Sequence, residues 1–260
     1  MQRYRRFAQG IAQRAGFLLK SQLERAHQIK RKRPIDLITE MDLRSQRLIV
    51  SAIRQSFPSH SILAEENEVF WSESPYRWII DPLDGTTNYA HRLPIFCVSI
   101  ALEMDGQIIV GVVYDPCRDE LFWAEKGRGA FLNRKRIRVS RTPALSESLL
   151  TTGFSYDVRE NPVNNLDHFW NFSLRTHAVR RLGSAALDLC YVAAGRFDGY
   201  WEMNLGPWDF AAGLLLVEEA GGKVTDFRGR AIHLEGKQVL ATNGHIHRAM
   251  MNVLKIGKIS

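Results

Sequence analysis

The sequence predicts a mixed α/β fold for a globular chain. Apolar residues recur at spacings of three and four near the N-terminus and again in the last third, which indicates amphipathic helices. Between these segments lie short apolar runs bounded by turn residues, which indicate strands. The 260 residues are 45% hydrophobic and 24% charged, so the chain can bury a sizeable core. This composition excludes a disordered or a disulfide-stapled chain.

Two helices are expected before the first strand. The first carries an apolar stripe opposite a charged face, and the stripe is made of Phe7, Ile11, Ala15, Leu18 and Leu19. Thr39 can cap the second helix, and Asp42 three residues later completes a pair that resembles a capping box. Apolar positions continue to Ile53, and Pro58 follows the expected end of this helix.

The middle of the chain is expected to form a sheet. Asp105-Gly106 lies between two apolar runs and is a strong hairpin signal. The expected strands are residues 61–64, 77–80, 95–104, 107–114 and 121–124. The first two end in acidic residues, as expected of buried strands whose C-terminal ends open on a cleft.

Helices and strands alternate again towards the C-terminus. We expect a helix over residues 185–194 and a strand over residues 197–202. Another helix starts at Pro207, because proline lacks an N–H that the first helical turn would leave unpaired. Asp209 therefore lies in the first turn of that helix.

The net charge of +7 is concentrated at the N-terminus. Residues 1–33 carry ten Lys and Arg but one acid, a charge of +9, whereas the rest of the chain sums to −2. A solvated helix face is the simplest interpretation of this segment. A nucleic-acid contact and an anion-steering patch are alternatives, and an organellar transit peptide is a weaker one.

The cysteines and the apolar runs indicate a cytoplasmic protein. Cys97, Cys117 and Cys190 are widely spaced and fit neither a disulfide framework nor a zinc ribbon, so a reducing compartment is expected. No run approaches the ~20 apolar residues of a membrane span, and no signal-peptide core is present. We therefore expect a soluble protein without a membrane partner.

Familiar catalytic signatures are mostly absent from the sequence. It has no Walker phosphate loop, no Gly-x-Gly-x-x-Gly, no His-Glu-x-x-His and no Gly-x-Ser-x-Gly, which argues against nucleotide kinases, zinc peptidases and serine hydrolases. The histidines lack metal-ligand spacing, and His245 and His247 are expected at the surface. Asp188 and Asp198 are given no role.

Acidic residues follow two neighbouring strands. Glu65 ends one short strand, and Asp81 and Asp84 come at the end of the next. Adjacent strands would bring these carboxylates together, where they repel each other unless cations neutralise them. Hard oxygen ligands favour magnesium over zinc. A divalent-metal site is therefore predicted.

Gly85-Thr86-Thr87 follows this acidic cluster. If these residues open a turn or helix, their backbone N–H groups can hold an oxyanion such as phosphate. Metal ions and an anion site in one pocket indicate phosphoryl chemistry. The alternative is that Asp-Pro-x-Asp-Gly is a simple turn, and the residues alone do not decide between these interpretations.

Two longer motifs resemble the signatures of the inositol monophosphatase family. They are Trp-Ile-Ile-Asp-Pro-Leu-Asp-Gly-Thr-Thr-Asn at residues 78–88 and Trp-Asp-Phe-Ala-Ala-Gly at residues 208–213. The shorter elements that fall in the family's order are Asp36-Leu37-Ile38-Thr39, Asp42, Glu65-Glu66, Gly183-Ser184-Ala185 and Glu202. The Thr-Thr-Asn ending favours the inositol branch over bisphosphate nucleotidases, and the resemblance covers nearly the whole chain.

The resemblance implies two or three magnesium ions in each site. Glu65, Asp81 and the Leu83 carbonyl would hold the first ion, and Asp81, Asp84 and Asp209 the second. Glu65 with water would hold a weaker third. Water would then attack phosphorus in line, without a covalent enzyme intermediate.

The same resemblance assigns roles in catalysis and substrate binding. Glu65 and Thr86, with Asp42 supporting Thr86, would orient and activate the attacking water. The implied substrate contacts, which include amides for phosphate and groups for the polyol, are Leu83, Asp84, Gly85, Thr86, Gly183, Ser184, Ala185, Glu202 and Asp209. The expected activity is release of phosphate from inositol monophosphates.

The implied fold is a layered αβαβα sandwich of the inositol monophosphatase and fructose-1,6-bisphosphatase type. Residues 1–145 would contain the large antiparallel sheet and most metal ligands, and residues 146–260 would complete one compact catalytic unit. The sequence has its weakest seam near residues 141–147. A homodimer and sensitivity to lithium are also implied.

The sequence departs from the family pattern in three places. Ala64 replaces a common glycine, residues 155–179 match no motif, and the basic run Lys30–Arg33 lies where the family has a mobile metal-gating loop. Two alternative functions therefore stay open. One is a fructose-1,6-bisphosphatase or another sugar or nucleotide phosphatase, and the other is an RNA- or transcription-associated regulatory protein that uses the basic N-terminus.

Overall fold

Two N-terminal helices cover one face of a large sheet. The computed structural model describes residues 1–25, 27–33, 35–66 and 68–256, and these helices are α1 (Gln2–Gln22) and α2 (Glu40–Ser56). The predicted apolar stripe of α1 is largely confirmed, because Ile11, Ala15 and Leu19 are buried. The capping box is also confirmed, since Thr39 Oγ1 accepts a hydrogen bond from Met41 and the Thr39 N–H donates to Asp42 at 2.8 Å.

A short hairpin that was not expected from the sequence precedes α2. Its strands are β1 (Ile29–Arg33) and β2 (Asp36–Thr39), which pair antiparallel. Its charged sequence, Ile-Lys-Arg-Lys-Arg, gave no strand signal because it lacks the alternation of a half-buried strand. The side chain of Arg33 and residue 34 lie outside the described parts.

Among the described residues, the large sheet has the strand order β10-β9-β8-β7-β6-β5-β3-β4. Its strands are β3 (Ser61–Ala64), β4 (Glu68–Phe70), β5 (Tyr76–Asp84), β6 (Cys97–Met104), β7 (Gln107–Asp115), β8 (Glu120–Glu125), β9 (Ala130–Leu132) and β10 (Lys135–Arg136). All five predicted strands are present, and the Asp105-Gly106 hairpin turn has positive φ at both residues. The pairing is antiparallel except between β3 and β5, which run parallel.

Two central helices separate this sheet from a smaller one. They are α5 (Ala185–Ala193) and α6 (Pro207–Glu219), close to the predicted ranges. The smaller sheet has the order β12-β11-β13-β15-β14, with β11 (Leu149–Thr152), β12 (Ala178–Arg180), β13 (Gly199–Met203), β14 (Lys223–Thr225) and β15 (Gln238–Thr242). The remaining elements are α3 (Thr86–Ala90), the 3-10 turn Leu145–Glu147, α4 (Leu166–Ser173) and α7 (His247–Leu254).

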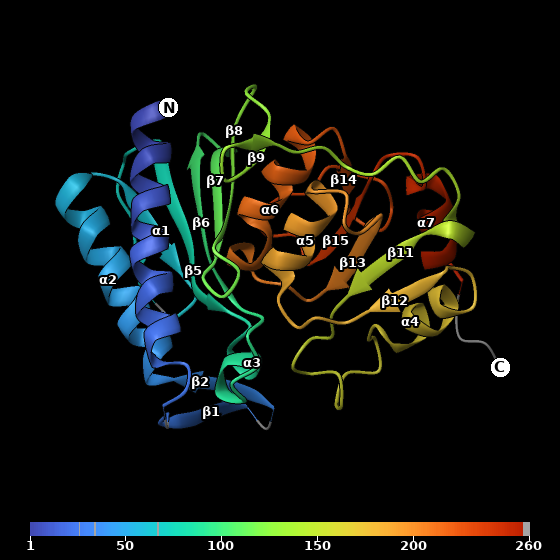
Figure 1. The fold of residues 1–260 in the computed structure, drawn as a ribbon, viewed down its shortest axis with the longest axis horizontal. Coiled ribbons are helices and arrows are strands. Elements are labelled where there is room, and N and C mark those ends of the chain that lie inside the picture. Colours follow the sequence, from blue (N-terminus) through green and yellow to red (C-terminus); the bar gives the residue numbers. More distant parts are fainter. Residues whose placement is uncertain (26, 34, 67, 257–260) are drawn as a thin grey trace.

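The layers follow the order helices, sheet, helices, sheet, helices (Figure 1). Separate apolar cores fill the spaces between layers, with Trp78 in the first, Phe210 in the second and Trp201 in the third. The predicted αβαβα sandwich is therefore confirmed. Helix α6 packs closely on β7, because a Cβ at Gly111 would lie 2.7 Å from the Ala212 carbonyl oxygen.

Length and hydropathy together rule out a membrane crossing for each helix described in the structure.

Two glycines of α1 should respond oppositely to alanine. Gly10 has no neighbouring atom within 4 Å of an added Cβ, so Gly10→Ala should stabilise the protein by about 0.8 kcal/mol through helix propensity. At Gly16 an added Cβ would lie 2.5 Å from Tyr114, so Gly16→Ala should destabilise it by about 1–3 kcal/mol. Urea unfolding of both variants measures these changes. Equal effects of the same sign would contradict the packing of α1 on β7.

Candidate active site

A cavity of about 710 Å³ lies between the two halves of the chain. Its lining includes every sequence-predicted site residue except Asp42, which lies behind Thr86. These lining residues are Glu65, Asp81, Leu83, Asp84, Gly85, Thr86, Gly183, Ser184, Ala185, Glu202 and Asp209. The structure thus brings together side chains that are up to 144 positions apart in the sequence.

The parallel pair β3 and β5 places Glu65 beside Asp81. Ala64 is in register with Ile80, and the Glu65 N–H donates to the Ile80 carbonyl at 3.1 Å. The register of β5 against β6 shifts between Asp81 and Asp84, which interrupts the regular ladder around Pro82. Asp81 Oδ1 accepts a hydrogen bond from the Leu83 N–H at 2.9 Å. The strand ends therefore present several acids to the same cavity.

Asp84 joins the two halves of the site. Its Oδ2 atom accepts hydrogen bonds from Ser184 Oγ at 2.6 Å and from the Ala186 N–H at 2.8 Å. Ser184 is also the N-cap of α5, so the start of that helix is fixed against the carboxylate. Burial raises the pKa of Asp84, although these hydrogen bonds oppose the rise.

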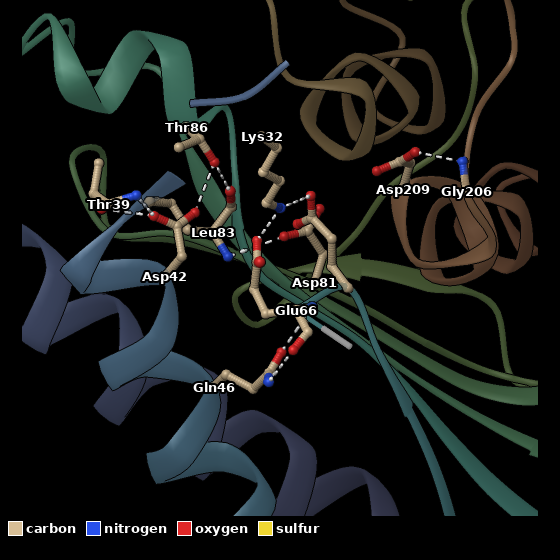
Figure 2. Close-up of polar contacts among 11 residues, drawn as sticks. Lys32, Thr39, Asp42, Gln46, Glu66, Asp81, Leu83, Thr86, Gly206 and Asp209 are labelled. Atoms are coloured by element: carbon tan, nitrogen blue, oxygen red, sulfur yellow. Dashed lines mark hydrogen bonds and ion pairs between the residues drawn. The ribbon is translucent and has the colours of Figure 1, made fainter. Parts of the chain in front are cut away.

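Asp209 enters the cavity from the first turn of α6, where the sequence placed it. Its Oδ2 atom accepts a hydrogen bond from the Gly206 N–H at 2.7 Å (Figure 2). Burial, followed by the negative charges of Glu65 and Asp84, raises the pKa of Asp209 well above its usual range.

The acids raise one another's pKa values across the cavity. Burial is the first cause at Asp81, and the charges of Glu65, Asp84 and Asp209 add to it. Burial likewise raises the pKa of Glu65 to about 8. Carboxylates in this state ionise readily when a cation is close, and their hard oxygen atoms fit a divalent ion.

A cation of the chain itself lies among these acids. Lys32, from β1, has its Nζ atom 3.4 Å from Glu65 Oε1 and forms a closer ion pair with Glu66 (Figure 2). Although burial opposes it, the charges of these two glutamates raise the pKa of Lys32. Within the described ranges, no three acidic, histidine or cysteine side chains already stand in an arrangement that could hold a metal ion.

Thr86 and Asp42 form a second buried pair beside the acids. Thr86 Oγ1 donates to Asp42 Oδ1 at 2.8 Å and also lies 3.0 Å from the Leu83 carbonyl oxygen. Asp42 Oδ2 accepts hydrogen bonds from the N–H and Oγ1 of Thr39, at 2.8 and 2.6 Å. The cap of α2 therefore holds the carboxylate that orients the Thr86 hydroxyl.

Gly85 is the N-cap of α3, so the Gly-Thr-Thr run does open a helix. Its φ of +95° favours glycine, and a Cβ there would lie 2.9 Å from the Ile95 carbonyl oxygen. Asn88 of α3 donates to the Leu182 carbonyl at 2.8 Å, which attaches this turn to the segment before α5. Asn88 was part of the quoted motif but was given no role in the sequence.

The opposite wall of the cavity carries Glu202 of β13. Its Oε2 atom accepts a hydrogen bond from the Tyr200 hydroxyl at 2.7 Å. Burial is the main reason that the pKa of Glu202 rises to about 7. Gly153 lies against this carboxylate, and an added Cβ would collide with it.

Several lining residues were missed by the sequence interpretation. Asp188, which was given no role, lines the cavity with a buried side chain that accepts a hydrogen bond from Thr151 Oγ1 at 2.8 Å. Tyr156, another lining residue, lies in the stretch that matched no motif.

The expectation that His247 lies at the surface was wrong. The side chain is buried between Thr225 and Thr242, and burial lowers its pKa to about 4.

A layered αβαβα fold with a cavity of acidic residues beside the turn that opens α3 is the arrangement expected of a metal-assisted phosphatase. The chain belongs to the inositol monophosphatase family, since a sequence model of that family matches residues 1–256. Membership of this family makes the protein a phosphatase and implies a divalent-metal cofactor.

Named relatives support the same assignment. The chain is 47% identical to the inositol-1-monophosphatase of Synechocystis over 232 residues, which cover 88% of this chain and 81% of that protein. It is 44% identical to the Nus factor SuhB of Pseudomonas aeruginosa, over 94% of this chain and 93% of that protein. The solved structure of the inositol monophosphatase from Anabaena is 47% identical, with a TM-score of 0.89 and coverage of 97% and 95%.

Proposed function

We propose that this protein hydrolyses inositol monophosphates with magnesium as its cofactor. The observation that carries the proposal is the gathering of Glu65, Asp81, Asp84 and Asp209 in one cavity beside the Thr86–Asp42 pair. Both halves of the chain supply these groups, and the family is one of phosphatases. Measuring phosphate release from inositol 1-phosphate with and without magnesium tests it.

The acids divide into two overlapping ligand sets in this proposal. Glu65, Asp81 and the Leu83 carbonyl would hold one ion, and Asp81, Asp84 and Asp209 a second, with Glu65 available for a third. Bound divalent ions neutralise the clustered charge and make a water molecule easier to ionise. The raised pKa values of Asp81 and Asp209 support this assignment, because burial and then repulsion from the neighbouring acids disfavour their ionised forms until a cation is bound.

Asp42 and Thr86 would fix the orientation of the attacking water. The Thr86 hydroxyl has one hydrogen atom, which it donates in a hydrogen bond of 2.8 Å to Asp42 Oδ1. The lone pairs of Thr86 Oγ1 are then free to accept a hydrogen bond from water. The Glu65 carboxyl lines the same cavity and would accept a proton from this water once bound cations hold it in its ionised form.

The N–H groups of Gly85 and Thr86 would bind phosphate, and the polyol would contact the other wall. Glu202, Asp84 and residues 183–185 offer carboxylate and backbone partners for hydroxyl groups. Glu202→Gln should therefore raise KM for inositol 1-phosphate several-fold more than it weakens magnesium binding. Steady-state kinetics and magnesium titration measure the two effects.

A matched control for this prediction is Glu103→Gln. Glu103 is also a buried glutamate, but it pairs with Arg77 on the large sheet and does not line the cavity. The Glu103→Gln variant should have a lower thermal stability and an unchanged KM for inositol 1-phosphate. A better catalytic efficiency on adenosine bisphosphate than on inositol 1-phosphate would contradict the polyol assignment.

Calcium should inhibit the enzyme at fixed magnesium. Calcium takes more ligands than magnesium and is less demanding of octahedral geometry, so it should occupy the acids without aligning water. Inhibition by lithium is also proposed, from the family resemblance. The Lys32 ammonium beside Glu65 should repel the lithium ion and so weaken this inhibition. Titration of each ion into a steady-state assay measures both. Full activity at high calcium would contradict the shared acidic site.

The quaternary state and location are further parts of the proposal. A homodimer is supported by an apolar stripe on and beside α4, whose side chains are 52–67% exposed: Val163, Leu166, Trp170 and Leu174. A cytoplasmic location is supported by three free cysteines. Residues 1–145 and 146–260 would act as one catalytic unit, since both line the cavity.

Two alternative functions, another phosphatase activity and a regulatory role through the basic N-terminus, are distinguished by substrate tests and by the contacts of the N-terminal cations. A fructose-1,6-bisphosphatase or nucleotidase would use the same acids, so comparison of substrates decides between them. The name of the Pseudomonas relative favours a regulatory role. Against a free basic N-terminus, the Arg3 guanidinium packs over Phe57, Arg5 pairs with Glu125, and Lys32 pairs with Glu66.

A further inference from the structure

A second basic segment lies far from the N-terminus in the sequence. Residues 126–141 contain seven Lys and Arg and no Asp or Glu. These cations are Lys126, Arg128, Arg134, Lys135, Arg136, Arg138 and Arg141. Outside this segment and residues 1–33, the chain has 18 Lys and Arg against 27 Asp and Glu. The segment is therefore a local positive region on an otherwise acidic body.

The fold places two cations of this segment on the same side of a sheet edge. Strand β10 is an edge strand of the large sheet, and the Ile137 N–H continues its pairing by donating to the Ala130 carbonyl at 2.9 Å. Ile137 and Val139 pack against the central core, so Arg136 and Arg138 project to the exposed side. Alternate residues of an extended strand are about 6.7 Å apart, which is close to the repeat of successive phosphates along an extended nucleic-acid strand.

These arginines line a groove of about 380 Å³ with the end of α6 and the turn after β15. We call it the basic groove; its charged members are Arg136, Arg138, Arg141 and Glu219, and His245 also lines it. The Glu219 carboxylate already accepts hydrogen bonds from the Gly127 and Gly129 N–H groups, at 2.7 and 2.6 Å. The groove shares no lining residue with the active-site cavity among the residues that the structure describes.

The guanidinium group of Arg136 packs against Gly129, but the arginines of the groove have no carboxylate partner among the described residues. Within residues 1–25, 27–33, 35–66 and 68–256, Arg136, Arg138 and Arg141 form no ion pair with a carboxylate. Charges on an edge strand can serve to block pairing with other chains. Strand β10 has only two residues, so the charge of Lys135 is enough to block such pairing. The remaining cations call for another explanation.

We propose that the basic groove binds the phosphodiester backbone of a nucleic-acid strand. Guanidinium groups bind phosphate oxygens through two parallel hydrogen bonds, and three arginines along one groove, none in an ion pair within the described residues, suit a chain of such groups. An acidic protein is the less favoured partner, because protein interfaces have an apolar or aromatic centre. The apolar lining here is small, consisting of Val139 and Ala220.

The test is binding of short fluorescein-labelled oligouridylate by the full chain, followed by anisotropy at about 50 to 200 mM salt. The test variant reverses three charges, Arg136→Glu/Arg138→Glu/Arg141→Glu. The matched control reverses three exposed cations of the N-terminal segment, Arg6→Glu/Arg14→Glu/Arg25→Glu. Melting temperature and magnesium-dependent phosphatase activity show whether each variant folds. If the test variant does not fold, Arg136→Gln/Arg138→Gln/Arg141→Gln is used in its place.

The groove variant should bind at least ~10-fold more weakly than the control. Its slope of log affinity against log salt should be smaller by about 2, since each phosphate contact on a single strand contributes roughly 0.7. Equal loss in both variants, or no binding by the unmodified protein, would overturn the proposal. Displacement by polyglutamate as efficient as by unlabelled RNA would assign the groove to an acidic protein instead. Parallel titration with oligothymidylate tells whether the strand is RNA or DNA.

Discussion

Asp81→Asn should reduce turnover by several orders of magnitude while leaving the protein folded. Asp81 belongs to both proposed ligand sets, so loss of its charge weakens two cation sites together. The same change relieves repulsion from Glu65, Asp84 and Asp209, which is part of what raises the pKa of Asp81. Stability without metal should therefore be unchanged or higher. Phosphate release and thermal unfolding in EDTA measure the two effects.

Asp198→Asn is the control for this variant. Asp198 is also buried, but it accepts hydrogen bonds from Ser140 Oγ and, at 2.7 Å, from the Leu149 N–H, away from the cavity. We expect it to lower stability and to keep turnover within a few-fold of the unmodified protein. Near-normal turnover of Asp81→Asn at saturating magnesium would refute its place as a shared ligand.

Without metal, the thermal stability of the protein should fall as pH rises from about 4.5 to about 8. Burial raises the pKa of Glu65 to about 8 and that of Glu202 to about 7, from an ordinary value of 4.5. Above pH 4.5 the unfolded chain releases these protons while the folded chain retains them. The unfolded state then binds fewer protons, so a higher pH favours unfolding.

Melting temperatures in EDTA across this pH range measure the effect. Saturating magnesium should flatten the dependence, because bound cations stabilise the ionised carboxylates of the folded state. Glu202→Gln should flatten the part of it below about pH 7, because that is the range over which Glu202 contributes, and should leave the part from 7 to 8 to Glu65. His247, whose pKa is lowered to about 4, acts in the opposite direction below pH 6.5, so the decisive range is pH 6.5 to 8. A melting temperature that rises with pH over that range in EDTA would show that these acids are already ionised and compensated in the folded protein.

Individual elements of the fold were predictable where side-chain periodicity and local motifs carry the signal, whereas the layered arrangement was expected from the family resemblance. The stripe of α1, the cap at Thr39 and the hairpin at Asp105-Gly106 each depend on nearby residues, and all three are present. The β1–β2 hairpin was missed because its sequence is a run of charges. Strands β11 and β12 were missed because their pairing joins residues far apart along the chain.

The candidate site could be predicted as a set of residues but not as an arrangement. The quoted motifs supplied the acids and the turn that now line one cavity. They did not reveal that Lys32 reaches Glu65 and Glu66 from a separate hairpin, since a charge run carries no information about its partner. Asp188 was also missed, because the packing of α5 brings it to the cavity and no sequence motif shows that packing.

The most direct test of the account is phosphate release by the purified protein from a panel of inositol, sugar and nucleotide phosphates, with magnesium and with EDTA. We expect the highest catalytic efficiency on an inositol monophosphate, complete loss of activity in EDTA, and recovery when magnesium is restored. Undiminished release of phosphate in EDTA, or no release from the whole panel with magnesium present, would contradict a metal-dependent phosphatase built on Glu65, Asp81, Asp84 and Asp209.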